Sequence, residues 1–340
     1  MTVDGTTIRA LAYPGLTGLP EPGDRVLLNT GALDLGLGTG GYALVVAIPD
    51  RLPPDPVGPG HLIKARYTPL QATVLGADEQ GSDYHELLRD ADDLAGLPVV
   101  VADLHSALPA ILAGYLASGP ADRLGASPRI AYVMLDGGAL PLWFSRSVSA
   151  LTEAGWLAGT VTVGQALGGD LETVSLHSGL LAARLVLRAD LVVVAQGPGN
   201  LGTGTRWGFS GVASGEAVNA AAVLHGRPVG SLRISQADPR ERHRGISHHS
   251  LTSYGRVALA RADIVVPELD GPFGAEVLAA AEPLAGRHNL VRVSVDGLTG
   301  VLRDCPVKLS TMGRSLDEDL AYFLASAAAG RYAASLASFG

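Results

Sequence analysis

The stretch Leu191-Val-Val-Val-Ala-Gln-Gly-Pro-Gly-Asn200 decides the fold, because an aliphatic run passes at once into glycine and polar residues. A short apolar run that ends in turn residues is typical of a strand buried on both faces. From about Ser82 onward the same pattern alternates with helical stretches. The other predicted strands cover residues 98–102, 129–135, 158–163, 228–234, 264–267 and 290–295. This alternation predicts an α/β domain with a mainly parallel, doubly wound sheet of about seven strands.

Helical stretches lie between these predicted strands. We expect helices over residues 106–117, 173–188, 216–225 and 275–284, and a last helix over 317–329. Ser315 stands just before the last of them and is the expected N-cap, since a serine side chain can accept a free backbone N–H there.

The first 78 residues have a different rhythm from residues 79–340, which predicts two domains. Short apolar runs at 8–12, 25–29, 43–48 and 62–66 are separated by clusters of glycine and proline. That pattern is typical of short antiparallel strands joined by tight turns. A small β-rich, barrel-like domain is therefore expected at the N-terminus.

Composition limits the partners and the compartment. A formal charge of -8 argues against nucleic acid as a partner, because nucleic-acid binding needs a concentrated basic surface. The most apolar segment, near residues 180–195, contains Arg184, Arg188 and Asp190 and is not a membrane span, and the start MTVDGTT is not a secretory signal. The lone Cys305 rules out an intrachain disulfide and a multi-cysteine metal site. We expect a cytoplasmic protein, with a homo-oligomer left open.

Polar residues follow nearly every predicted strand, whereas routine turns precede them. In open α/β sheets, ligands bind outside the carboxyl ends of the strands, so this edge is the expected site. Asp103 and His105 lie two residues apart after one strand, where the carboxylate can orient the imidazole or both can reach a metal. The alternative is that Asp103 or Ser106 merely caps the helix that follows.

The segment Gln196 to Thr205, QGPGNLGTGT, contains a formal G-x-G-x-x-G. The glycines continue before any helix begins, and the next strand-end acid, Asp238, comes too late to bind a ribose, so NAD is not expected. We interpret the segment as a loop that cradles an anion, with a plain mobile connection as the alternative. Its candidate ligand-binding residues are Gln196, Gly197, Gly199, Asn200, Thr203, Thr205 and Arg206.

The densest polar cluster is RERHRGISHHS at residues 240–250. Ser247 is expected to cap a helix that runs to about Ala260, with the following histidines in its first turn. His243, His248 and His249 are candidate catalytic residues, and Arg244 and Ser250 are candidate ligand-binding residues. Alternatively, a histidine here joins Asp103 and His105 in a divalent metal site, or the segment is a solvated charged loop.

Three motifs, VLLNTGALDLGLGTGGY at 26–42, GHLIKARYTP at 60–69 and HRGISHHS at 243–250, resemble a bacterial family of proteins of unknown function found in actinobacteria and firmicutes. Ser250 stands where we expect threonine in that family, which keeps the hydroxyl. The resemblance implies no activity. It implies that both predicted domains form one functional unit, with Asn29, Thr30 and Asp34 on a glycine-rich loop at 29–42. A close-packed turn that needs small residues is the alternative.

Together these features predict an enzyme that acts on a small anionic molecule, phosphorylated or nucleotide-like, by hydrolysis or group transfer. Asp103, His105, His243, His248 and His249 would carry the chemistry, and metal assistance through Asp103, His105 and His248 is the nearest variant. A non-catalytic ligand sensor or interaction module built on the same sheet is the competing hypothesis.

Overall fold

The computed structural model describes residues 1–3, 5–37, 40–55, 58–119 and 127–336. The chain divides into two compact units, Met1–Leu75 and Gly76–Gly340. Among the described residues, no helix is both long enough and apolar enough to span a membrane.

The first unit consists of small, separate sheets, so the described residues form no closed barrel. A three-stranded sheet has the order β3-β5-β4, and two hairpins pair β1 with β2 and β6 with β7. The elements are β1 (Thr2–Val3), β2 (Thr6–Thr7), β3 (Ala10–Leu11), α1 (Pro14–Thr17), β4 (Leu27–Asn29), α2 (Gly31–Asp34), β5 (Ala43–Ala47), β6 (Leu62–Lys64) and β7 (Ala72–Val74).

The glycine-rich stretch at 29–42 begins with the short helix α2. The Thr30 hydroxyl donates to Asp34 Oδ2 at 2.9 Å, and Asn29 Oδ1 accepts from the Gly31 N–H at 3.3 Å. These polar side chains therefore close a local turn. Residues 38 and 39 of the stretch lie outside the described residues.

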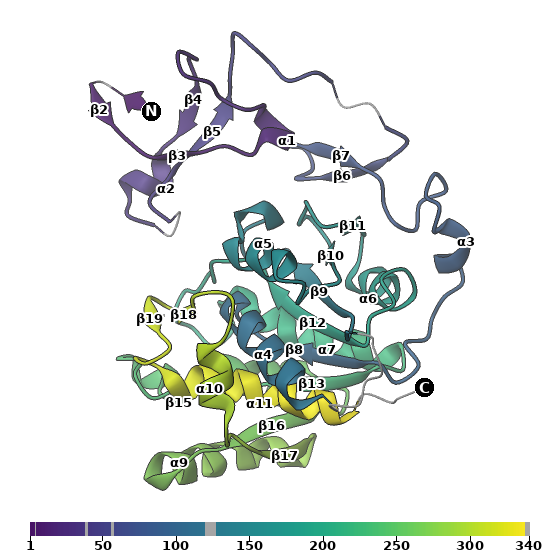
Figure 1. Ribbon diagram of the computed structural model, residues 1–340, viewed down its shortest axis with the longest axis vertical. Coiled ribbons are helices and arrows are strands. Elements are labelled where there is room, and N and C mark those ends of the chain that lie inside the picture. The colour runs from purple at the N-terminus through teal and green to yellow at the C-terminus, as the bar shows by residue number, and fades with distance from the viewer. Residues whose placement is uncertain (4, 38–39, 56–57, 120–126, 337–340) are drawn as a thin grey trace. The chain divides into compact units, whose positions relative to one another are not determined.

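The second unit is built on an all-parallel sheet, which has eight strands over the described residues, in the order β11-β10-β9-β12-β8-β13-β16-β17. The α/β prediction is confirmed, and helices cover both faces of the sheet (Figure 1). The strands are β8 (Pro98–Val101), β9 (Ile130–Leu135), β10 (Gly159–Thr162), β11 (Leu171–Glu172), β12 (Leu191–Gln196), β13 (Arg227–Ser231), β16 (Asp263–Glu268) and β17 (Asn289–Ser294).

Alternate residues of each strand face two separate cores, as a strand with period two requires. Val99 and Val101 of β8 pack into one core, and Val100 packs into the other. The helices are α3 (His85–Leu88), α4 (Leu108–Ser118), α5 (Arg146–Glu153), α6 (Leu176–Leu185), α7 (Ala213–Val223), α8 (His248–Thr252), α9 (Gly271–Ala281), α10 (Leu298–Arg303) and α11 (Leu320–Leu336). A Cβ on Gly114 would overlap the Ala327 carbonyl, so α4 and α11 cross with their backbones in contact.

Several predicted boundaries were wrong. The eighth strand, β11, was not predicted and lies just before the predicted helix 173–188. Asp170 accepts hydrogen bonds from Thr160 of β10 instead of starting a helix. Helix α6 starts later, after its N-cap Ser175. Ser315 is not an N-cap, since it lies in β19 (Arg314–Ser315), which pairs with β18 (Ser310–Thr311), and α11 begins only at Leu320.

The predicted strand 228–234 is also divided. After β13, the chain leaves the large sheet and forms β14 (Ile234–Ser235), which pairs antiparallel with β15 (Gly245–Ile246). This small hairpin folds residues 233–250 back on themselves. As a result, Arg233 on one arm lies beside the histidines on the other.

Candidate functional site: a histidine cluster at the centre of the sheet edge

Three neighbouring strands at the centre of the sheet, β12, β8 and β13, supply the site at their carboxyl ends. After β8 the chain continues to β9, which lies on the β12 side of β8. After β12 the chain crosses over β8 to form β13 on its other side. Such a reversal of direction is where ligands bind in open α/β sheets. Asp103 follows β8, the glycine-rich loop at 197–208 follows β12, and Arg233 follows β13.

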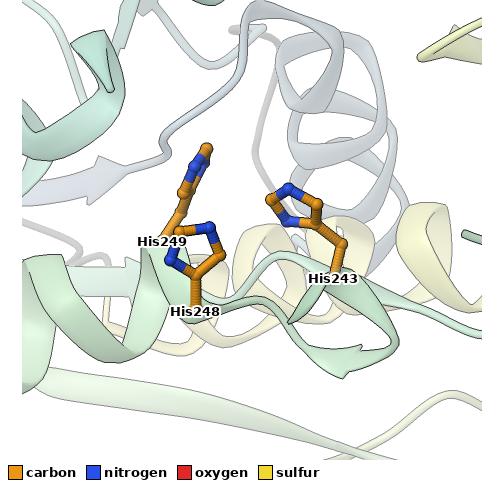
Figure 2. Close-up of side chains that lie close together, drawn as sticks. All are labelled: His243, His248 and His249. Atoms are coloured by element: carbon orange, nitrogen blue, oxygen red, sulfur yellow. The ribbon is translucent and has the colours of Figure 1, made fainter. Parts of the chain in front are cut away.

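His243, His248 and His249 gather at this edge. One ring nitrogen from each lies within 4.8 Å of the others. Figure 2 shows the three rings turned toward one another, His243 from one segment and the other two from α8. The Ser247 side chain accepts the His249 backbone N–H at 3.2 Å, so the predicted N-cap is confirmed and holds both α8 histidines in the first turn.

Each ring of the cluster has a distinct set of contacts. His243 Nδ1 lies 2.8 Å from Ser247 Oγ. The His249 ring stacks on Phe209 with centroids 3.8 Å apart and planes 3° from parallel. His248 Nε2 is buried and has no hydrogen-bond partner among the described residues.

Two imidazoles of the cluster, those of His243 and His248, are held in their neutral form. Burial, followed by the charges of Arg233 and Arg240, lowers the pKa of His243 to about 3. Burial, followed by His249 and Arg242, lowers the pKa of His248 to about 4. A neutral ring keeps a lone pair on one nitrogen, so both side chains can act as ligands or hydrogen-bond acceptors at neutral pH.

Asp103 and Arg233 lie beside the cluster and are almost fully buried, at 4% and 3% exposure. Asp103 Oδ2 is 3.7 Å from His249 Nδ1 and 3.9 Å from Arg233 Nη1. Neither this oxygen nor Arg233 Nη2 has a hydrogen-bond partner within the described part of the chain. An unpaired buried polar atom costs free energy, so these two side chains have hydrogen-bonding capacity that the described residues do not use.

A chain of buried charges runs from Arg233 to the C-terminal part of the unit. Arg233 Nη2 lies 3.8 Å from Asp238 Oδ2, which also binds Arg240 at 2.8 Å and Arg314 at 3.3 Å. The hydrogen bond from Arg240 is the main reason that the pKa of Asp238 is lowered far below its usual value. Arg314 then contacts Asp319 at 2.9 Å. These acids balance the arginines that surround the cluster.

His105, two residues beyond Asp103, has different neighbours. Its Nδ1 lies 2.9 Å from the Tyr132 hydroxyl, and its Nε2 lies 2.7 Å from Ser145 Oγ. Tyr132 donates onward to the Gln196 carbonyl at 3.0 Å, and Ser145 accepts the Val148 N–H as N-cap of α5. Burial lowers the pKa of His105 to about 4. Both of its ring nitrogens are thus engaged by the protein.

The loop at 197–208 is closed by its own hydrogen bonds. Thr203 Oγ1 lies 3.0 Å from Thr205 Oγ1, which also accepts the Gly208 N–H at 3.1 Å. Gln196 Nε2 ties the start of the loop to the Asp103 carbonyl and to Asn200 Oδ1, both at 2.8 Å. An added Cβ on Gly204 would lie 3.9 Å from the Arg242 guanidinium, so the loop passes close to the arginine segment.

A family model for proteins of unknown function, DUF3866, matches residues 9–330 and so spans both units. The chain belongs to the DUF3866 family. Comparison with curated proteins and with solved structures finds no match.

In this DUF3866 chain, the structure brings four of the five candidate catalytic residues together: Asp103, His243, His248 and His249. His105 lies apart from them in its contacts. Ser250 accepts the Arg233 backbone N–H at 2.9 Å and so fixes the turn between β13 and β14. Arg206 and Arg244 are exposed.

Sequence reasoning missed Arg233 and Phe209. The run GSLRIS around Arg233 has the pattern of an ordinary strand with one charge, and Phe209 stands alone after the glycines. A buried arginine must find acidic partners, and the nearby Asp238 was a signal that could have pointed to it. No local signal in the sequence marks the stacking of Phe209 on His249.

Proposed function

We propose that this chain is an enzyme that acts on a small anionic substrate, phosphorylated or nucleotide-like, by hydrolysis or group transfer. The observation that carries the proposal is the pair of buried, unpartnered polar atoms beside the histidine cluster, Arg233 Nη2 and Asp103 Oδ2, within the described residues. One is a cationic donor and the other an anionic acceptor. Hydrolysis of an anionic ester needs both kinds of group at one place.

Arg233 is the group that would hold the anion. Its Nη2 has no hydrogen bond within the described residues and is buried, where charge-assisted hydrogen bonds are strongest. Arg242, beside the loop at Gly204, supplies a second cation nearby. The loop residues Asn200, Thr203 and Thr205 would line the approach, with Arg206 and Arg244 attracting the substrate from the surface.

Asp103 is the group that would take the proton. The O–H bond of the attacking water or hydroxyl breaks toward the free Asp103 Oδ2, while the oxygen bonds to the phosphorus or carbonyl centre and the leaving group departs with the bonding pair. Arg233 stabilises the charge that gathers on the remaining oxygens. Both ring nitrogens of His105 are engaged by other side chains, so in this scheme His105 would hold the backbone near Asp103 in place and would not transfer a proton.

The single Cys305 supports placing this activity in a reducing compartment such as the cytoplasm. The match of one family to residues 9–330 supports the view that both units serve it together.

The test is turnover of p-nitrophenyl phosphate, bis-p-nitrophenyl phosphate and a panel of phosphorylated metabolites, with inorganic phosphate as competitor. Arg233→Gln keeps a polar side chain and removes the charge, so kcat/KM should fall by about 100-fold or more. Arg261→Gln, which changes an exposed arginine before β16, is the matched control and should leave turnover unchanged. Phosphate binding that depends on Arg233 without any turnover would replace the enzyme by a ligand sensor.

A further inference from the structure

We propose that His243, His248 and His249 bind one divalent metal ion of the zinc class, each through Nε2, and leave a fourth position open for water or substrate. The inference stands on the geometry of the cluster and does not require the enzyme proposal. Three imidazoles with one open position are the ligand set of catalytic zinc sites.

The hydrogen bonds of the cluster select the ligating nitrogens. His243 Nδ1 is taken by Ser247 at 2.8 Å, which leaves its Nε2 free. His248 Nε2 is the atom that is buried with no partner among the described residues. His249 Nδ1 faces Arg233 at 3.3 Å and Asp103 at 3.7 Å, so its Nε2 is the nitrogen available to a metal.

The spacing of the rings suits a metal ion after a small adjustment. The ring nitrogens lie within 4.8 Å of one another. Zinc–nitrogen bonds of about 2.05 Å in a tetrahedron place the nitrogens ~3.3 Å apart. Changes in side-chain torsion that bring the nitrogens closer by up to ~1.5 Å would close that difference. Imidazole ligands favour zinc, cobalt, nickel or copper over magnesium or calcium, which prefer oxygen.

The groups behind the rings match what a metal site needs. Ligating histidines usually donate their other N–H to a carboxylate, carbonyl or hydroxyl, which fixes the tautomer. Ser247 fills this role for His243 and Asp103 for His249, while the Phe209 stack fixes the plane of the His249 ring.

A metal on His249 Nε2 also affects Arg233. Ligation requires the proton on Nδ1, so this nitrogen can no longer accept from Arg233 and instead donates toward Asp103. The Arg233 N–H released in this way would become a free donor beside the cluster. Metal binding would thus prepare the site for an anion.

The experiment is a metal titration of the full chain after chelator treatment. Zinc content by mass spectrometry should reach one equivalent, and cobalt should give the visible absorption of a four-coordinate site. His243→Ala and His248→Ala should each weaken zinc binding by more than about 100-fold, beyond the effect of losing an outer partner. His177→Ala, which removes an exposed histidine on α6, is the matched control and should bind like the wild type.

His248→Cys tests whether the position acts as a ligand or only shapes the fold. A thiolate is also a zinc and cobalt ligand, so this variant should recover binding and add a sulfur-to-cobalt charge-transfer band in the near ultraviolet. A wild-type chain that binds well under one equivalent, or alanine variants that bind as tightly as wild type, would overturn the metal site. Zinc binding without turnover would support the metal site and contradict only the proposed enzyme activity. Turnover by a chain that binds no zinc would support the enzyme activity and contradict only the metal site.

Discussion

Two histidine sites lie at the same edge of the sheet, and they differ in how their polar atoms are satisfied. His105 has both ring nitrogens engaged, by Tyr132 and by Ser145. In the cluster of His243, His248 and His249, by contrast, one ring nitrogen is buried without a partner among the described residues, and Asp103 Oδ2 and Arg233 Nη2 beside it are in the same state. A satisfied network holds the fold together, whereas an unsatisfied one is complete only with a further group.

The largest effect is expected from Arg233→Met. This change leaves Asp103 buried without its cation, and breaking a buried ion pair costs about 4 kcal/mol. The free energy of unfolding should fall by that order in urea denaturation of the metal-free chain. Arg261→Met, at an exposed position, should change it by less than about 0.5 kcal/mol. A loss under about 1 kcal/mol for Arg233→Met would mean that the charges beside the cluster are not coupled as described.

The second largest loss of stability is expected at His105, whose ring nitrogens are both hydrogen-bonded. His105→Ala removes a buried ring and its two hydrogen bonds, to Tyr132 and Ser145, which should cost about 3 kcal/mol of stability. Zinc affinity, measured by the same titration as for the wild type, should be unchanged. If His105→Ala abolishes zinc binding while stability is retained, His105 belongs to the metal site and its role is not structural.

The sequence predicts those parts of the fold and of the site that depend on interactions between residues near one another in the chain. Seven strands were predicted correctly because each is an apolar run with its own signal, and Ser247 was identified as a cap for the same reason. His105 was found because it follows such a run, and the histidines at 243, 248 and 249 were found because they form the densest polar cluster in the sequence. The different environments of Asp103 and His105 could not be predicted, because their partners Arg233, Tyr132 and Ser145 come from other strands and loops.

A third histidine sharpens the comparison through pH. His288 Nε2 donates to the Tyr254 carbonyl at 2.7 Å and its Nδ1 accepts the Ala262 N–H at 3.2 Å, and burial lowers its pKa. Since the folded pKa lies below the unfolded value of about 6.5, the stabilisation is present above pH ~6.5 and is lost as the pH falls below it.

His288→Gln should therefore reduce stability at pH 7 and make the remaining stability less dependent on pH between about 6.5 and 5 than in the wild type. Urea denaturation at a series of pH values measures this, with His177→Gln as the exposed control. An unaltered pH dependence would show that burial of His288 does not select its neutral form.

The smallest effect is expected from His248→Ala in the metal-free chain. The ring nitrogen that this change removes has no partner in the described part of the chain, so stability should change by less than about 1 kcal/mol. With zinc present, the wild type should gain stability and the variant should not, because only the wild type binds the ion. Thermal unfolding with and without zinc compares the two.

The most direct test of the comparison is to observe all nine histidine rings at once. Long-range ¹H–¹⁵N spectra of the ¹⁵N-labelled chain report the protonation and ligation of each ring nitrogen, and alanine variants assign the signals. On addition of one equivalent of zinc, the Nε2 signals of His243, His248 and His249 should move to metal-bound positions while those of His105 and His288 stay in place. Zinc shifts at His105, or none in the cluster, would contradict the account.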